Sequence, residues 1–168
     1  MKKKLFVVLV VTLALGLLSI QAFAGPPEDA SGDWYYIPSA EPVIVKVAGG
    51  NAFMTIADTG SWTGTIVGDE VDTGRVIIHR NGAWQYWGDV LFASATVNGK
   101  TGGLEMKVFG QRPDATADWI GTWRITAVTG ELEGLHGHGT WDGPGWSPAE
   151  PGVHGVVSYS GNVNFRPN

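Results

Sequence analysis

The stretch WIGTWRITAVTGELEGLHGHGTW, residues 119–141, decides the fold class of this chain. Its first part alternates, with Trp123 and Ile125 on one face and polar side chains mostly on the other, as in a half-buried strand. Residues 129–135 hold glycines where a compact turn has to bend tightly. Residues 135–141 resume the alternation, and two of their apolar-face positions are glycine. The stretch therefore predicts two strands joined by a short turn.

The start of the chain has the pattern of a secretory signal peptide. Three lysines precede an apolar run over residues 5–20, and Ala22-Phe23-Ala24 supplies the small-x-small pattern of a cleavage site. We therefore expect residues 1–24 to be removed after Ala24 and the mature protein to be secreted or periplasmic in a bacterium. The alternative is a membrane anchor, since the apolar run is about as long as the shortest spanning helix.

The remaining composition excludes several function classes. Removing residues 1–24 from the 168 leaves 144, which carry 8 basic and 16 acidic residues, a net charge of −8. An acidic surface repels phosphate backbones, so we expect no nucleic-acid partner, and no membrane association once the signal peptide is removed. The chain has no cysteine, so disulfides and thiolate chemistry are excluded. No motif indicates a cofactor or a metal.

Residues 25–168 read as one all-β domain. Gly, Thr, Val and Trp are abundant, no window has a helical period, and Asn81-Gly82 and Asn98-Gly99 are typical hairpin turns. Eight or nine strands with short connections predict an antiparallel meander that closes into a calycin-like barrel, most simply of eight strands, with an open sandwich as the alternative. We expect residues 25–33 to be loose and residues 68–72 to form a turn.

The apolar faces of these strands would line the barrel interior. They mix large side chains with Gly and Ala, so the glycines either leave a cavity or make room for tryptophans. The candidate ligand-lining residues are Trp62, Leu91, Met106, Trp123, Trp141 and Tyr159. No Asp, Glu, His, Lys or Arg falls on the predicted inner faces, so the catalytic residues, if there are any, are unknown. An ionisable group would have to come from a misassigned strand, at Arg75 or His79, or from the rim, at Asp58, Asp114, Asp118 or His154.

Other motifs each have a plain structural explanation beside a functional one. His136 and His138 share a strand face and would chelate a metal with a third ligand, but the pattern places them outside the barrel, where solvated histidines are the simpler interpretation. Exposed tryptophans would form a platform for sugars; the candidates are Trp84, Trp87 and Trp146. Residues 143–146, Gly-Pro-Gly-Trp, begin a long loop that is either a lid or an inert connection.

The segment GTWRITAVTGELEGLHGHGTW resembles the end of the allene oxide cyclase barrel superfamily. Six positions match its turn-and-strand pattern, namely Thr129, Gly130, Leu132, Gly134, Gly137 and Gly139. The likeness covers about residues 53–141, is strongest to small bacterial domains of unknown function, and extends distantly to dirigent proteins. It implies an eight-stranded antiparallel barrel with a mainly apolar cavity. The superfamily includes plant cyclases that act on fatty-acid epoxides, but none of their catalytic residues matches a position here.

Three functions remain open on these grounds. The favoured one is an exported barrel that binds a small hydrophobic molecule in an apolar, aromatic cavity. The second is an isomerase or cyclase acting on a hydrophobic substrate, which requires at least one polar residue inside the barrel. The third is a carbohydrate-binding module built on exposed tryptophans.

Overall fold

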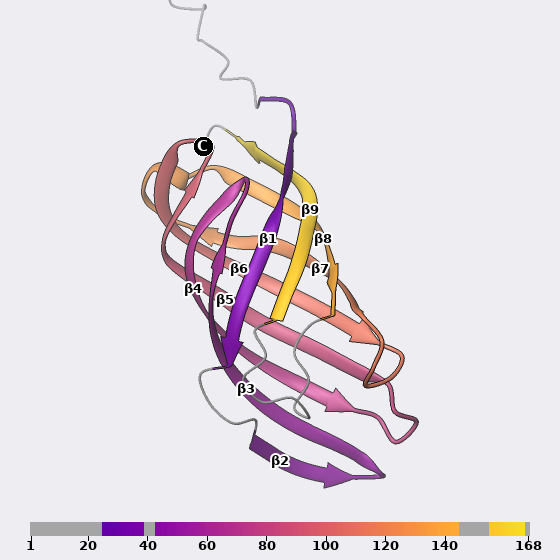
Figure 1. The fold of residues 1–168 in the computed structure, drawn as a ribbon. Coiled ribbons are helices and arrows are strands. Elements are labelled where there is room, and N and C mark those ends of the chain that lie inside the picture. The colour runs from indigo at the N-terminus through magenta and orange to yellow at the C-terminus, as the bar shows by residue number, and fades with distance from the viewer. Residues whose placement is uncertain (1–24, 39–42, 145–154, 167–168) are drawn as a thin grey trace, which may run out of the picture.

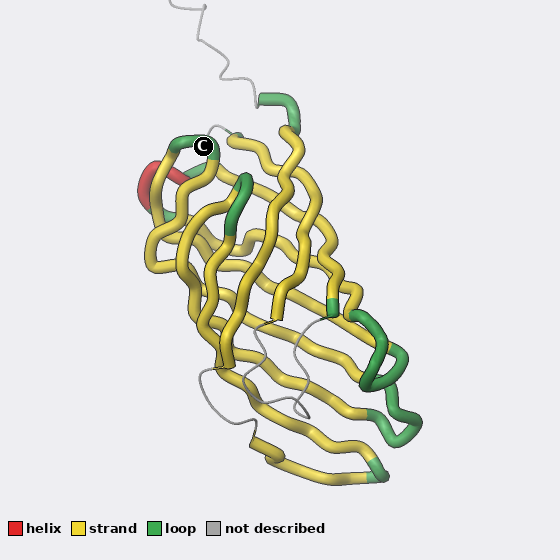
Figure 2. Tube along the Cα trace, in the orientation of Figure 1, coloured by secondary structure: helices red, strands yellow, loops and turns green. Residues whose placement is uncertain are grey.

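The computed structural model describes residues 25–38, 43–144 and 155–166, and these form an all-β fold with one turn of 3-10 helix (Figures 1 and 2). The strands are β1 (Glu28–Pro38), β2 (Val43–Ala48), β3 (Asn51–Trp62), β4 (Ile66–Ile78), β5 (Trp84–Val97), β6 (Lys100–Arg112), β7 (Trp119–Val128), β8 (Leu135–Gly143) and β9 (Gly155–Phe165), and the helical turn is η1 (Gly130–Leu132). Within these residues, no helix has the length and apolar character needed to cross a membrane. The expected signal peptide lies outside the described residues.

Eight strands close into an antiparallel barrel. Each strand from β3 to β8 pairs with the next along the chain, and β1 completes the wall by pairing with both β9 and β3. Closure removes free edges from these strands, which is the physical advantage that predicted a barrel over an open sandwich. The predicted all-β meander of eight strands and a possible ninth is confirmed.

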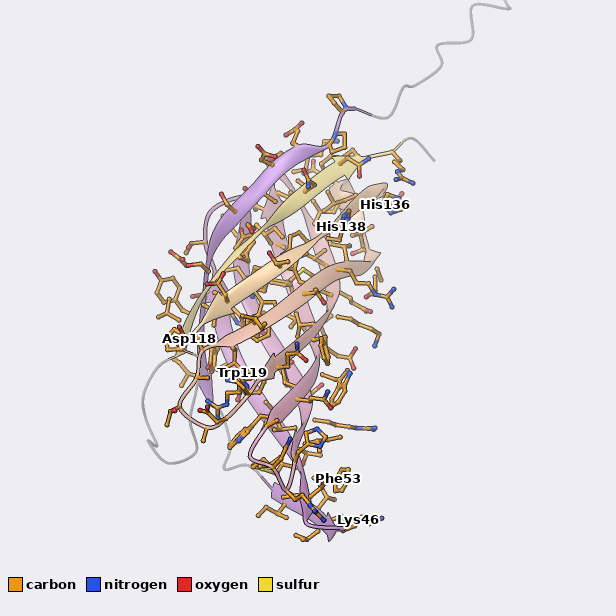
Figure 3. The ribbon with its side chains drawn as sticks, turned by 90° about the vertical axis from the view of Figure 1, so that its right-hand side faces the viewer. Lys46, Phe53, Asp118, Trp119, His136 and His138 are labelled. Atoms are coloured by element: carbon orange, nitrogen blue, oxygen red, sulfur yellow. The ribbon has the colours of Figure 1, made fainter. Side chains whose placement is uncertain are left out.

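The ninth strand, β2, extends one side of the barrel. It pairs with β3 at residues 51–55, whereas β1 pairs with β3 at residues 58–62, so the two strands follow one another along the same edge of β3. The β2–β3 hairpin consequently projects beyond the barrel (Figure 1), and Lys46 and Phe53 lie near its far end (Figure 3).

Aromatic rings fill the half of the barrel that lies next to η1. The hydroxyl of Tyr159 accepts a hydrogen bond from the N–H of Ile66 and donates one to the carbonyl of Thr63, both 2.9 Å long, and so ties β9 to the β3–β4 turn. A Cβ atom on Gly139 would lie 2.7 Å from Nε1 of Trp123, and one on Gly161 would lie 2.8 Å from its Cζ2. These glycines therefore make room for an indole ring.

The predictions for residues 28–33 and for Leu91 were wrong. Residues 28–33 are not loose but part of β1, and Glu28 to Tyr36 pair with β9. Leu91 does not face the interior: it is 51% exposed, while Val90 and Phe92 are buried. A β-bulge interrupts the β5–β6 register between Phe92 and Ala95. Side chains in a strand alternate with a period of two. The extra residue of the bulge therefore puts the β5 residues before it on the face opposite to the one that uninterrupted alternation from Ala95 predicts.

Candidate functional site

Three acidic side chains lie inside the barrel, where ionisable groups were predicted to be absent. Asp58 comes from β3, and Glu70 and Asp72 come from β4, with Glu70 only 3% and Asp72 only 1% exposed. Asp58 and Asp72 are direct cross-strand partners, and Glu70 pairs with Gly60 two positions along. We call these three residues the acid cluster. The prediction failed because residues 68–72 are not a turn: β4 begins at Ile66, and its alternation directs residues 70 and 72 inward.

Glycines on the neighbouring strands make space for the acid cluster. A Cβ atom on Gly60 would lie 2.5 Å from Oε1 of Glu70. A Cβ atom on Gly88 would lie 2.0 Å from the hydroxyl oxygen of Tyr86 and 2.7 Å from Oδ1 of Asp72. All three distances are too short for any side chain, so the backbone at these two glycines forms part of the wall around the acids.

Each β4 acid has one partnered oxygen. The indole N–H of Trp34 donates to Oε1 of Glu70 over 3.1 Å, and the hydroxyl of Tyr86 donates to Oδ2 of Asp72. The second oxygens, Oε2 of Glu70 and Oδ1 of Asp72, are buried and have no hydrogen-bond partner among the described residues. Buried polar atoms are nearly always paired with protein, water or a ligand, so these two oxygens mark positions for a hydrogen-bonding partner, which is a donor when the carboxyl group is ionised.

Burial raises the pKa of all three acids. Desolvation raises the pKa of Asp58 to about 6. Desolvation also raises the pKa of Asp72 to about 7, although the hydrogen bond from Tyr86 opposes the shift. The pKa of Glu70 rises to about 8 through desolvation and then through the nearby charge of Asp72. The acid cluster therefore holds protons at neutral pH that ordinary carboxyl groups release.

A buried arginine, Arg112, lies at the end of the barrel where β5 begins and β6 ends. The guanidinium carbon of Arg112 lies 4.1 Å from the ring centre of Trp84 and 4.9 Å from that of Trp119. Its Nε and Nη2 atoms are buried without a partner among the described residues, and desolvation lowers its pKa. Burial, followed by the charge of Asp58, raises the pKa of Tyr36, which also feels the charge of Arg112. Tyr36 is therefore a neutral hydroxyl between an acid and a cation.

A cavity of about 50 Å3 lies beside Asp58, Asp72 and Tyr36. Its lining residues are Trp34, Tyr36, Met54, Ile56, Asp58, Asp72, Val76, Trp84, Tyr86, Trp119, Trp141 and Val157. Pockets for drug-sized ligands measure roughly 300–1,000 Å3, so this one admits only a few non-hydrogen atoms. The cavity is aromatic, as predicted, but two carboxyl groups on its wall make it partly polar.

Among the six predicted ligand-lining residues, Trp141 is a lining residue of this cavity. Trp62, Met106, Trp123 and Tyr159 are buried in the barrel away from it, and Leu91 is outside. The residues missed were Tyr36, Tyr86, Glu70, Asp72 and Arg112. Extending the alternation of Leu104, Met106 and Val108 by two steps would have placed Arg112 inside, because β6 continues to that residue.

The candidates named for the rim and the misassigned strands are mostly on the surface. Asp58 is the exception and lies inside, while Asp114, Asp118 and Arg75 are exposed. Ring atom Nε2 of His79 is 2.9 Å from Oε1 of Gln85, outside the cavity. His154 lies outside the described residues.

The residues predicted as a metal site or a sugar platform are partly exposed, partly buried and partly outside the described residues. His136 and His138 are exposed on β8 (Figure 3), and no group of three His, Cys, Asp or Glu residues suited to a metal occurs in the described part of the chain. Of the three tryptophans proposed for sugars, Trp84 is buried and Trp87 is 41% exposed. Trp146 lies outside the described residues. The lid proposed over residues 143–146 is described only at residues 143 and 144.

Comparisons with known proteins support the fold alone. No family model matches the chain, and no curated protein matches it. A solved structure of a protein with unknown function from the DUF3224 family of Shewanella oneidensis MR-1 is similar: it is 14% identical, the match covers 85% of this chain and all of that one, and the TM-score is 0.62. This neighbour fits a small barrel domain of unknown function. The resemblance to the allene oxide cyclase superfamily stays a prediction.

Proposed function

We propose that this protein binds a small molecule at the acid cluster, in the cavity between the aromatic rings. The observation that carries the proposal is Oδ1 of Asp72. This atom belongs to a side chain that lines the cavity and is 1% exposed, and it has no partner among the described residues. A buried oxygen without a donor costs about 1–3 kcal/mol. A ligand that brings a donor removes this cost, whereas a purely apolar ligand does not.

The wall of the cavity favours a small amine with an apolar body. Four indole and two phenol rings surround the space, and aromatic faces attract organic cations as well as apolar groups. The carboxyl groups of Asp58 and Asp72 supply the counter-charge when they ionise. The volume of about 50 Å3 argues against fatty acids and terpenoids, which need a far larger space. The hydrophobic-ligand hypothesis is thereby narrowed to a small ligand with one cationic or donor group.

Calorimetric titration of the full chain with isobutylamine, and with isobutanol as its neutral isostere, tests the proposal. We expect the amine to bind more tightly, and to tighten from pH 5 to pH 8, because Asp58 and Asp72 ionise at about pH 6 and 7. Asp72→Asn should weaken amine binding at least tenfold. Asp69→Asn, on the outward face of the same strand, is the matched control and should change nothing. Equal binding of both probes, or an unaffected D72N variant, would refute the proposal.

A second candidate function is proton transfer on a small carbonyl substrate. It is favoured by Asp58, a cavity carboxyl group with a pKa of about 6, because a general base works best when its pKa lies near the operating pH. The carboxylate would take a proton from the carbon next to a carbonyl, which leaves an enolate, and a proton or deuteron would then return to the same carbon. NMR of butanone in D2O measures this exchange. Wild-type protein should accelerate it and Asp58→Asn should not; equal rates for both would remove this candidate.

We propose export on the sequence pattern of residues 1–24 alone. Expression in a bacterial host, followed by intact mass measurement of periplasmic and secreted fractions, tests it. A mature chain that begins at Gly25 is the expected result. Full-length protein retained in the cytoplasm would refute the proposal.

A further inference from the structure

A groove of about 1520 Å3 crosses the outside of the barrel from β2 and β3 to β8. Phe53 lies at its β3 side, where the hairpin projects, and His138 lies on β8 toward the opposite end of the molecule (Figure 3). The groove is formed largely by outward-facing side chains of neighbouring strands. The groove and the interior cavity share Met54, Ile56 and Val76 as wall residues, but the cations of the groove, Arg75, Lys107 and Arg124, do not line the cavity. A ligand held by these cations therefore does not depend on the function proposed for the acid cluster.

One row of the groove is an aromatic platform beside a cation. Arg75, Trp87, Phe109 and Thr122 are successive cross-strand partners on β4, β5, β6 and β7. The rings of Trp87 and Phe109 are 5.4 Å apart between centroids and inclined by 54°. Trp87 is 41% exposed. A large ring left this open beside a second ring is a feature of binding surfaces.

The next row, two residues further along the strands, is charged. Asp89, Lys107, Arg124 and His138 are successive cross-strand partners on β5, β6, β7 and β8. Lys107 forms an ion pair with Asp89, whereas the side chain of Arg124 has no hydrogen bond or ion pair within the described residues. Like charges directly opposite one another destabilise a sheet. The Lys107–Arg124 pair is therefore a place where a bound anion would relieve repulsion.

The groove carries a net positive charge, whereas the net charge of residues 25–168 is negative. Residues 25–168 carry 8 basic and 16 acidic side chains. Three of the 8 basic residues, Arg75, Lys107 and Arg124, line the groove, but only one of the 16 acidic ones, Asp89, does so within the described residues. This concentration of cations on an acidic protein is charge complementarity toward an anionic ligand.

We propose that this groove binds an acidic oligosaccharide. One sugar ring lies against Trp87 and Phe109, because the C–H face of a pyranose suits the electronegative face of an aromatic ring. Its carboxylate or sulfate groups meet Arg124 and Lys107, and Arg124 is free to form a two-pronged hydrogen bond with either anion. The two rows are about 7 Å apart, given a rise of 3.3–3.4 Å per strand residue. A ring and its acidic substituent span such a distance.

A nucleic acid fits this surface less well. The two rings are inclined by 54° instead of parallel, so they offer a platform for one ring and not for a run of stacked bases. The net charge of −8 on residues 25–168 also repels a long phosphate chain. A short acidic sugar avoids this repulsion because it contacts only the basic groove.

Calorimetry of the full chain at two salt concentrations, with four probes, tests the proposal. The probes are trigalacturonate, a sulfated trisaccharide, neutral cellotriose and a short thymidine oligonucleotide of matched charge. We expect at least one acidic sugar to bind tenfold or more tightly than cellotriose, and to weaken as salt rises. The two acidic sugars show whether carboxylate or sulfate is preferred. No binding, equal binding of cellotriose, or tighter binding of the oligonucleotide overturns the proposal.

Variants locate the contact. Arg124→Gln should weaken binding of the acidic sugar by about tenfold, the loss expected for one charge-assisted hydrogen bond. We also expect the acidic sugar to change the tryptophan fluorescence of the wild-type protein, and Trp87→Ala should abolish this change. Arg166→Gln removes an equal charge from an exposed position outside the groove and should change affinity less than twofold. Equal effects of the two arginine variants overturn the assignment. All three substitutions are at exposed side chains, and circular dichroism verifies folding.

Discussion

Replacing Asp72 with asparagine should change how the stability of this protein depends on pH. The folded protein keeps a proton on Asp72 up to about pH 7, whereas an ordinary aspartate releases it near 3.8. The free energy of unfolding therefore falls as pH rises between these two values, because the folded state binds more protons than the unfolded one. The full slope is 1.36 kcal/mol for each pH unit and levels off as Asp72 ionises near pH 7, so the loss from this residue between pH 5 and pH 8 is about 3 kcal/mol. That is a large part of a typical stability of about 5–15 kcal/mol.

Urea unfolding of wild type and Asp72→Asn at pH 5 and pH 8 measures this effect. The asparagine keeps an oxygen that accepts the hydrogen bond from Tyr86 but cannot ionise, so the variant should gain about 3 kcal/mol relative to wild type between the two pH values. Part of the wild-type decline should persist in the variant, since the pKa of Glu70 is also raised, to about 8. Asp69→Asn, which is exposed, should retain the wild-type decline. A wild-type stability that rises or stays level from pH 5 to pH 8 would refute the reasoning.

The core allows three further predictions, all measured by urea unfolding at pH 5. Gly139→Ala should cost about 1–3 kcal/mol or more, because its Cβ would lie 2.7 Å from Trp123 Nε1 and 1.9 Å from a backbone oxygen. Tyr159→Phe should cost about 1–3 kcal/mol, because the N–H of Ile66 loses its buried acceptor. Leu132→Ala should cost about 2–5 kcal/mol, because this η1 side chain is completely buried.

Matched substitutions separate these effects from general damage. Gly25→Ala should be neutral, because nothing lies within 4 Å of its added Cβ. Leu91→Ala should cost far less than Leu132→Ala, because Leu91 is half exposed. Equal losses at the two leucines would contradict the assignment of facing at the bulge.

The general architecture could be predicted from the sequence because the period-two pattern and the turn dipeptides are local signals. Leu104, Met106 and Val108 alternate cleanly, and they are buried as the pattern predicts. The facing of Leu91 could not be predicted in the same way, since the bulge after Phe92 depends on how β5 and β6 pair. A one-residue insertion leaves no mark in composition or hydropathy.

The candidate site was missed for a different reason. Acidic residues between glycines, such as Glu70 and Asp72, are typical of exposed turns, so the local signal pointed away from the interior. Their burial depends on Gly60 and Gly88, which lie on other strands and are brought close only by the barrel register. Burial of an ionisable group is a property of the assembled barrel, and only the structure reveals it.

The pairing of β1 with β9 has a consequence for how the protein folds. Tyr36 pairs with Gly155, and Glu28 with Val163, so the seam joins the earliest strand to the last one. Contacts between such distant residues slow folding, because a long loop must be ordered before they form. During synthesis the barrel cannot close until β9 emerges. Until then the edge of β1 that pairs with β9 is unpaired and its apolar face is exposed. Chaperone binding and aggregation should therefore concentrate in that interval.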